Sequence, residues 1–375
     1  MPFARPLLQH TLALVLATHL TAQTFVVDAA NGPGTNFTDL PAAIATVPDG
    51  AILVVRPGGY TPFSIDGKSL SILADTSVTV GSIGQSCFVR NLQANQQVTL
   101  RGMQFLGSIT NTMIRCLDND GPVLIDSCWG YGLYPTNGCA IEATRCTDVH
   151  IRNGTFRPAN VPLLVIESFV RATDSTFEVS SIYPGVRVFD GTVELNSCTV
   201  RGNGGAPGRG AVSLINSDLR LLGTSHLSTT FPWWVITGSG NARVDPTAVL
   251  NSGSYQPIIN TVNATMMSMP SVTADPGVGS NLATATLDGP STGIGVLFAA
   301  LRTNAFFVSW SPDPILLLPG SEVQMASGAL ATPLAGSYIV PNSPAITGVR
   351  VAWQGASLDA AIGLQLSNAV TYVHL

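Results

Sequence analysis

The chain has 375 residues, of which 45% are hydrophobic and only 10% are charged, and its formal net charge is −5 at pH 7. This hydrophobic content is sufficient to bury a continuous core, which excludes an intrinsically disordered chain. A mildly acidic chain whose only lysine is Lys68 lacks the basic surface that nucleic-acid binding requires.

Residues 1–22 have the pattern of a secretory signal peptide. One arginine, Arg5, precedes an apolar stretch from Thr11 to Ala17, and the segment ends at the small residue Ala22. The stretch is too short to span a bilayer core of about 30 Å. We therefore expect a protein without a membrane span that is secreted and resides in the extracellular space or at the cell surface.

The segment that follows is predicted to cap the fold. Apolar residues at Leu40, Ile44 and Val47 have helical spacing, and a proline stands in the first turn, so a short amphipathic helix is expected here. A strand over residues 52–55 follows. The open end of a solenoid exposes unpaired strand edges, and a cap of this kind protects them.

Six segments then repeat an apolar-x-apolar strand followed by a polar turn. Their second anchors lie 25, 26, 21, 23 and 26 residues apart, at Leu100, Ile125, Ile151, Ala172, Leu195 and Leu221. Such a period marks the stacked coils of a solenoid. Because the coils show period-two strands and no long helical pattern, we predict an all-β fold, a right-handed parallel β-helix over residues 23–265.

The repeat is absent after residue 273, where short strands alternate with Gly and Pro turns. This pattern predicts a C-terminal β-sandwich over residues 273–375. Its segments 339–342, 349–354 and 366–370 resemble a C-terminal module of secreted bacterial proteins with varied N-terminal domains. That resemblance implies a role in attachment or sorting.

Segments 37–50, 52–60 and 65–72 resemble the start of pectin methylesterases and related pectin-lyase-like β-helix proteins. Residues 123–128 are similar to the strand-turn-strand step of pectate lyases. The resemblance implies the fold more specifically than an activity. The catalytic motifs of the methylesterases are missing, since no Gln-Asp pair occurs and Arg187 stands where their nucleophilic aspartate belongs.

In pectin-lyase-like enzymes the first strand of each coil floors the substrate cleft. Acid/base glycosidic chemistry usually needs two neighbouring carboxylates, and here the floor offers only Glu142, beside Arg115. A catalytic role and a cross-strand ion pair are the two interpretations, and we favour the ion pair. The side chains expected to point outward on these strands are Met113, Arg115, Ala140, Glu142, Leu164, Ile166, Arg187, Phe189, Ser213 and Ile215.

A second catalytic candidate lies on the apolar-x-apolar strands. His150 can lie one coil from Asp126 and Arg171, which would suit a base oriented by a carboxylate. A solvated ladder of alternating charges explains the same residues, and it is the interpretation we favour.

An aromatic loop is the best binding candidate. Trp129, Tyr131 and Tyr134 could stack on sugar rings, or they could pack on one another and on the coil below, and we favour the packing. The chain has six cysteines, an even number that permits disulfides in an exported protein. The pair we favour is Cys128–Cys139, which would close this loop.

Metal binding is a minor alternative. Asp118 and Asp120 are the only local candidates for Ca²⁺, and a turn built from such residues is commoner than a calcium loop. The cysteine spacing matches no zinc motif. The expected protein therefore has no cofactor.

The leading hypothesis is a secreted, non-catalytic β-helix protein that binds an extracellular polysaccharide or a cell-surface component. The alternative is a divergent carbohydrate-active enzyme, either a polysaccharide lyase or a carbohydrate esterase.

Overall fold

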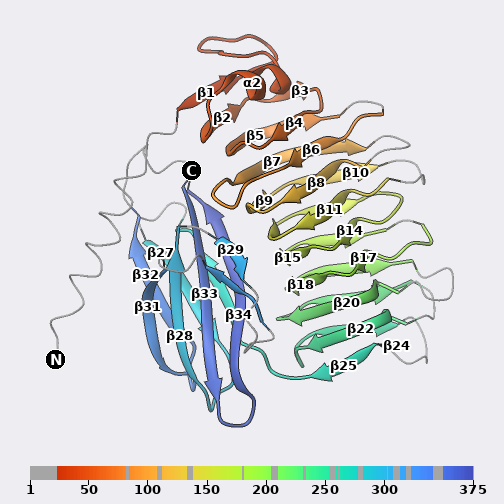
Figure 1. The fold of residues 1–375 in the computed structure, drawn as a ribbon, viewed down its shortest axis with the longest axis vertical. Helices are drawn as coiled ribbons and strands as arrows, with labels where there is room; N and C mark the ends of the chain where they lie inside the picture. The colour runs from red at the N-terminus through yellow and green to blue at the C-terminus, as the bar shows by residue number, and fades with distance from the viewer. Residues whose placement is uncertain are drawn as a thin grey trace. The chain divides into compact units, whose positions relative to one another are not determined.

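The computed structural model of the chain contains two compact units, Gln23–Met267 and Ser268–Leu375. The first is a parallel β-solenoid and the second consists of antiparallel sheets, which confirms the predicted all-β fold class (Figure 1). The structure describes residues 23–81, 84–107, 112–132, 138–179, 181–203, 210–230, 234–252, 259–260, 262–277, 282–301, 303–306, 313–317, 322–340 and 349–374.

A complete solenoid coil contributes one strand to each of three parallel stacks, which we name in chain order the first-strand, middle-strand and last-strand stacks. The middle-strand stack carries the repeated apolar-x-apolar pattern. It consists of β1 (Thr24–Val27), β2 (Ala51–Val55), β5 (Leu70–Val80), β7 (Val98–Gly107), β9 (Val123–Asp126), β12 (Val149–Arg152), β15 (Phe169–Thr173), β18 (Thr192–Asn196), β20 (Val212–Leu222), β22 (Ile236–Val244) and β25 (Asn263–Met266).

Four of these strands bend and serve two stacks. The ends of β5 and β7 enter the last-strand stack, and the starts of β20 and β22 belong to the first-strand stack. Each of these two stacks has nine strands in the described ranges. The remaining first strands are β4 (Ser64–Asp66), β6 (Cys87–Arg90), β8 (Ile114–Asn119), β11 (Ile141–Cys146), β14 (Leu163–Ile166), β17 (Val186–Phe189) and β24 (Ile259–Asn260). The remaining last strands are β3 (Gly58–Tyr60), β10 (Trp129–Gly132), β13 (Thr155–Arg157), β16 (Thr176–Glu178), β19 (Thr199–Gly202), β21 (His226–Thr229) and β23 (Val249–Ser252).

One residue with positive φ makes most corners between first and middle strands and between middle and last strands. Between the first and middle strands of four successive coils, the residues in the left-handed conformation are Asp118, Arg145, Glu167 and Asp190. A non-glycine residue pays a steric penalty there, which short polar side chains tolerate best. The residue after the corner often ties adjacent coils, as where Ser168 accepts a hydrogen bond from the Cys146 backbone N–H through its hydroxyl.

The predicted helix is α2 (Leu40–Thr46), which lies at the N-terminal end of the solenoid (Figure 1). Asp39 caps it by accepting a hydrogen bond from the Leu40 backbone N–H at 2.8 Å. Leu40 and Ile44 are buried in the solenoid core. In the described ranges no helix has the length and apolarity that a membrane crossing requires.

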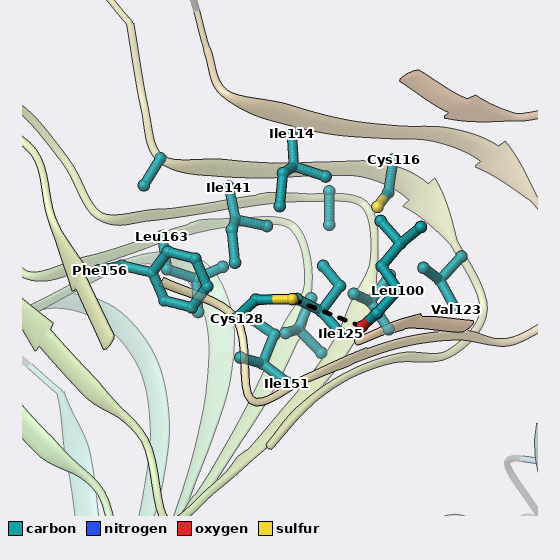
Figure 2. Close-up of a cluster of buried hydrophobic side chains, with 14 of the residues drawn as sticks. Leu100, Ile114, Cys116, Val123, Ile125, Cys128, Ile141, Ile151, Phe156 and Leu163 are labelled. Carbon is teal, nitrogen blue, oxygen red and sulfur yellow. Dashed lines mark hydrogen bonds between the residues drawn. The ribbon is translucent and has the colours of Figure 1, made fainter. Parts of the chain in front are cut away.

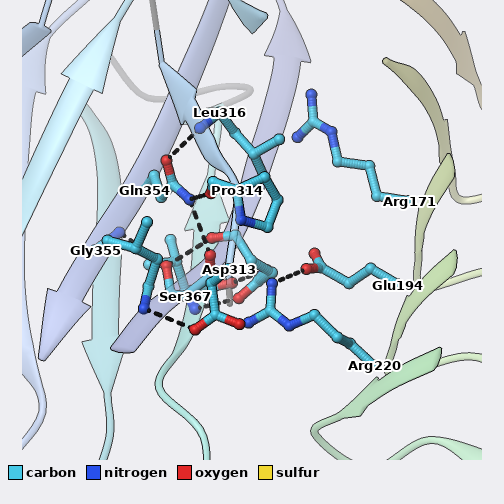
Figure 3. Close-up of polar contacts among 12 residues, drawn as sticks. Arg171, Glu194, Arg220, Asp313, Pro314, Leu316, Gln354, Gly355 and Ser367 are labelled. Atoms are coloured by element: carbon cyan, nitrogen blue, oxygen red, sulfur yellow. Dashed lines mark hydrogen bonds and ion pairs between the residues drawn. The ribbon is translucent and has the colours of Figure 1, made fainter. Parts of the chain in front are cut away.

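The second unit has two antiparallel sheets whose apolar residues share one core that includes Val272, Leu297, Trp353 and Tyr372. A buried amide, Gln354, ties a short hairpin to the larger sheet by bonding the Leu316 N–H and the Pro314 carbonyl (Figure 3). The smaller sheet contains β26 (Ser271–Asp275), β27 (Leu282–Asp288) and β32 (Leu334–Ile339). The larger sheet contains β31 (Glu322–Ala329), β28 (Ile294–Ala300), β33 (Arg350–Asp359) and β34 (Gly363–Val373). The hairpin consists of β29 (Thr303–Phe306) and β30 (Ile315–Leu317).

Candidate functional site

The predicted aromatic loop begins as strand β10 of the last-strand stack. Trp129 and Tyr131 alternate with Gly130, so both rings stand on the outer face of the solenoid. The two rings are stacked, with centroids 5.7 Å apart and planes 10° apart. Tyr131 is 40% exposed. Tyr134 lies outside the described residues.

The glycine between the rings has a structural cause. A Cβ atom at Gly130 would lie 2.8 Å from Cδ1 of Phe156 and 3.0 Å from the sulfur of Met113. Phe156 of the next coil therefore fills the core beneath the rings, and it stacks in turn on Phe177 at a centroid distance of 6.0 Å. β10 pairs in parallel with β7 on one side and with β13 on the other, and this pairing fixes the backbone that carries the two rings.

The neighbouring coils widen this surface. Leu106, which precedes Tyr131 by one coil, is 47% exposed, and Arg157, which follows it, is also exposed. Gln104 and Thr155 flank Trp129 in the same way. We call the surface of these four residues and the two rings the aromatic platform. The four flanking residues were not identified from the sequence. Gln104 and Leu106 stand on either side of the inward Phe105, and Thr155 and Arg157 stand on either side of the inward Phe156, so strand alternation could have predicted that they point outward.

The predicted disulfide between Cys128 and Cys139 is wrong, because all six cysteines are free and buried. Cys128 faces the solenoid core among Leu100, Ile125 and Ile151, and its thiol lies 3.5 Å from the Leu100 carbonyl oxygen (Figure 2). The side chain thus takes an inward anchor position of its coil and does not close a surface loop. Burial raises the pKa of the Cys128 thiol to about 12.

On the first-strand stack, the cross-strand pairing of Arg115 and Glu142 is present. Arg115 donates to both carboxylate oxygens, at 2.8 Å and 3.1 Å. Thr112 and Thr144 also donate hydrogen bonds to this carboxylate, each at 3.4 Å. The arrangement engages both oxygens of Glu142 in a fixed, bidentate geometry. Among the side chains expected to point outward, Met113 and Ala140 belong to the solenoid core instead.

A hollow of about 240 Å³, a volume that includes open solvent, lies close to this ion pair. Its lining includes Cys87, Phe105, Thr112 and Met113. Ligand pockets usually enclose about 300–1,000 Å³ with convergent polar groups. The space in this hollow that admits the centre of a water molecule is only about 10 Å³, far below that range, and its lining residue Thr112 donates a hydrogen bond to Glu142.

The middle-strand candidates Asp126 and His150 do not face each other. His150 pairs in register with Leu124 and Arg171, whereas Asp126 pairs with Arg152. The carboxylate of Asp126 lies 3.4 Å from Arg101, and the His150 ring contacts the Thr173 hydroxyl at 3.3 Å.

Ion pairs between successive coils continue along this stack. Arg171 bonds both oxygens of Asp148, at 2.8 Å and 3.0 Å. Further along, Arg220 contacts Glu194 at 2.5 Å (Figure 3). The charges are paired between coils, but Asp148, Arg171, Glu194 and Arg220 are buried, so the ladder is not the solvated one predicted from the sequence.

The proposed calcium ligands are engaged otherwise. Arg145 lies 2.5 Å from Asp118, and this hydrogen bond lowers the pKa of the Asp118 carboxyl. Asp120 is exposed and uses its backbone carbonyl to accept from the Thr147 hydroxyl. Within the described ranges, no three His, Cys, Asp or Glu side chains gather closely enough to hold a metal ion.

Comparisons with known proteins give no family. No family model and no curated protein matches the chain. Among solved structures, pectate lyase Pel9A is similar at 11% identity over 67% of this chain and 79% of that chain, with a TM-score of 0.44. The enzymatically active domain of bacteriophage CBA120 tailspike protein 2 is 9% identical over 94% and 76%, with a TM-score of 0.41. The A-module of the Azotobacter vinelandii mannuronan C-5 epimerase AlgE6 is 11% identical over 60% and 88%, with a TM-score of 0.30.

Proposed function

We propose that the chain is a non-catalytic polysaccharide-binding protein whose aromatic platform stacks on sugar rings. The rings of Trp129 and Tyr131 stack on each other, which leaves one face of each ring for a ligand. The observation that carries the proposal is the position of this pair on the outside of a regular strand, with Tyr131 40% exposed. Aromatic faces suit the apolar faces of pyranose rings, and the flanking Gln104 and Arg157 supply hydrogen-bond donors for sugar hydroxyls. A rigid strand binds with little loss of conformational entropy.

The state of Glu142 supports binding without catalysis. A general acid needs a proton to donate and a nucleophile needs a free oxygen, but both Glu142 oxygens accept hydrogen bonds from Arg115. The alternative function, a divergent lyase or esterase, requires this ion pair to open when substrate binds. Secretion to the extracellular space or cell surface belongs to the same proposal and rests on residues 1–22, which lie outside the described residues.

The test is binding of purified residues 23–375 to a glycan array, followed by affinity measurements on the glycans that bind. Stacking of one ring contributes about 1.4 kcal/mol, so Trp129→Ala and Tyr131→Ala should each weaken binding roughly tenfold. Phe189→Ala is the matched control, because Phe189 is an outward aromatic residue of the first-strand stack.

Two results would contradict the proposal. Unchanged affinity in both ring variants would remove the platform as the binding site. Product formation from a bound glycan that disappears in Glu142→Gln would establish the enzyme alternative and place chemistry on the first-strand stack.

A further inference from the structure

The two ends of the solenoid differ. At the N-terminal end, helix α2 buries Leu40 and Ile44 in the core. At the C-terminal end the last strands are β23, β24 and β25, which pair with β21 and β22, and in the described ranges no further strand pairs with them. Among these residues, only the C-terminal end therefore leaves open strand edges, which are templates for pairing with another strand.

The apolar core is also open at this end. In β25, Ala264 pairs in register with Ala242 of the preceding coil, and Met266 pairs with Val244. Ala242 and Val244 are buried at 1% and 0% exposure, whereas Ala264 is exposed and Met266 is 58% exposed. The inward positions of the last coil thus present apolar surface to solvent, a state that marks an interaction site.

We propose that a second copy of this chain covers this surface, so that two solenoids join at their C-terminal ends by antiparallel pairing of β25 about a two-fold axis. We call the surface formed by β23, β24 and β25 the open end. The proposal concerns assembly and does not depend on sugar binding at the aromatic platform.

The backbone of β25 supplies the hydrogen-bonding edge. The Met267 N–H donates to the Val244 carbonyl of β22 at 3.0 Å. Backbone groups alternate between the two edges of an extended strand, so the N–H and C=O groups of Ala264 and Met266 point away from β22. Among the described residues β25 pairs with β22 alone. These two residues can therefore bond an added strand.

A two-fold axis through Thr265 matches this edge to itself. It places Ala264 of one copy opposite Met266 of the other, and the backbone groups that both residues direct to the free edge then face each other as a hydrogen-bonded pair. Both residues occupy inward positions, so the core side of one copy continues into the core side of the other. A small side chain also meets a large one in each pair, which favours interdigitated packing.

Composition favours a second copy over an unlike partner. The strands of the open end read Val-Leu-Asn-Ser, Ile-Asn and Asn-Ala-Thr-Met, without a charged residue. In a two-fold interface the same patch meets itself, so a neutral patch avoids the repulsion of like charges. Natural edge strands that resist pairing carry lysine, other charges or proline, and β25 has none of these.

The size of the open end sets the strength of the dimer. A coil of 21–26 residues has a perimeter of about 75 Å at about 3.3 Å per residue. Its cross-section, with the outward side chains, offers on the order of 500 Å² per copy, and the total of about 1,000 Å² is the lower limit for a specific interface. We therefore expect a dimer that dissociates at micromolar concentrations. Because α2 caps the other end, assembly closes at two copies and forms no filament.

The first measurement is sedimentation equilibrium of purified residues 23–375 over concentrations from about 1 to 100 μM. The mass should rise from one chain to two and then stop. A single-chain mass throughout, or a mass that rises beyond two chains, would overturn the proposal. If the Ala264 and Met266 amides are protected from hydrogen exchange in a single chain, another segment of this chain covers the edge, and the second copy is ruled out.

The second measurement uses variants of β25. Met266→Lys brings two ammonium groups together in the dimer, and Ala264→Pro removes an edge N–H without removing a bond to β22. Each should raise the dissociation constant at least about tenfold. Leu358→Lys is the matched control, because Leu358 is an apolar residue of the second unit that is 57% exposed, and it should leave the dimer unchanged. Loss of the dimer in Leu358→Lys alone would move the interface to the second unit and overturn the proposal.

The third measurement asks whether the partner is a second copy bound through the same strand. Met266→Lys and Met266→Glu should each remain single chains alone and form dimers when mixed, since their charges then attract across the two-fold axis. Such rescue also shows that both variants are folded. A mixture that stays as single chains would overturn the antiparallel pairing of β25.

Discussion

The six cysteines illustrate how a coil position decides the chemistry of a residue. Each thiol is buried, and burial raises the pKa of Cys87, Cys139 and Cys198 to about 12. Since the thiolate is the reactive species, these side chains should be inert in the folded protein.

We expect that a thiol reagent at neutral pH labels none of the six cysteines in the native protein and all six in denaturant, whether or not a reductant is present. Mass spectrometry of the labelled chain measures the number of adducts. A native chain whose count in denaturant rises by two only after reduction would contain a disulfide and would contradict the structure.

Sequence reasoning failed at Cys128 for a physical reason. An even number of cysteines in an exported chain predicts disulfides in small domains whose cores are insufficient, but a solenoid buries apolar side chains along its whole length. The alternation of β10 places Trp129 outward next to Cys128, and the turn before it directs Cys128 into the core. The aromatic residues could thus be predicted as a binding candidate, whereas the parallel stacking of Trp129 on Tyr131 and the close approach of Phe156 to Gly130 have no signal in the sequence.

At the scale of elements, the coil is the unit of stability. Phe156 is fully buried beneath the aromatic platform and stacks on Phe177 of the next coil. Replacing a buried phenylalanine by alanine costs about 3–5 kcal/mol, because transfer energy is lost and a cavity remains. A solenoid coil contacts only its neighbours, so the loss should be local.

We expect Phe156→Ala to lower hydrogen-exchange protection most in β10, β13 and β16, and much less in β2 and β23. Phe189→Ala, which removes an outward ring from the first-strand stack, should lower protection by far less. Uniform loss of protection across the whole solenoid in Phe156→Ala would show that the coils unfold as one cooperative unit.

The strands of the solenoid could be predicted from the sequence where the apolar-x-apolar pattern repeats. Regular anchor spacing gave the parallel register between Val123, Val149, Val170 and Val193, which the structure confirms. The bent strands were not predicted, because their corners have no regular sequence signal. In β7 the bend lies at Gly102, whose φ is 75°, and in β5 it lies between Leu73 and Val78, where Ser77 has a φ of 69°.

At the scale of the whole molecule, the two units depend on different kinds of interaction. The solenoid repeats one core position in every coil, whereas the second unit adds single polar contacts to the apolar core that its sheets share. Asn368 is an example, since its amide accepts a hydrogen bond from the Val272 N–H at 2.7 Å and donates one to the Val272 carbonyl at 2.9 Å. Such contacts have no sequence period, so the region could be predicted as antiparallel strands but not in its register.

A buried histidine should make the stability of the second unit depend on pH. The ring of His374 lies against Tyr338 and Tyr372, and its Nε2 forms a hydrogen bond with the Tyr338 hydroxyl at 2.6 Å. Burial lowers the pKa of His374 below its ordinary value of 6.5, because desolvation disfavours the imidazolium. As the pH falls below about 6.5, the unfolded chain therefore binds a proton that the folded unit does not, and stability decreases.

The measurement is hydrogen-exchange protection in β33 and β34 between pH 7.5 and 5.5, after correction for the intrinsic exchange rate. Protection should fall with pH in the native chain, and His374→Gln should remove most of that dependence while keeping a hydrogen-bonding group near Tyr338. His226→Gln is the matched control, because His226 belongs to the solenoid strand β21 and should leave the dependence intact. A native chain with constant protection over this range, or a His374→Gln variant with an undiminished slope, would show that the proton is bound elsewhere.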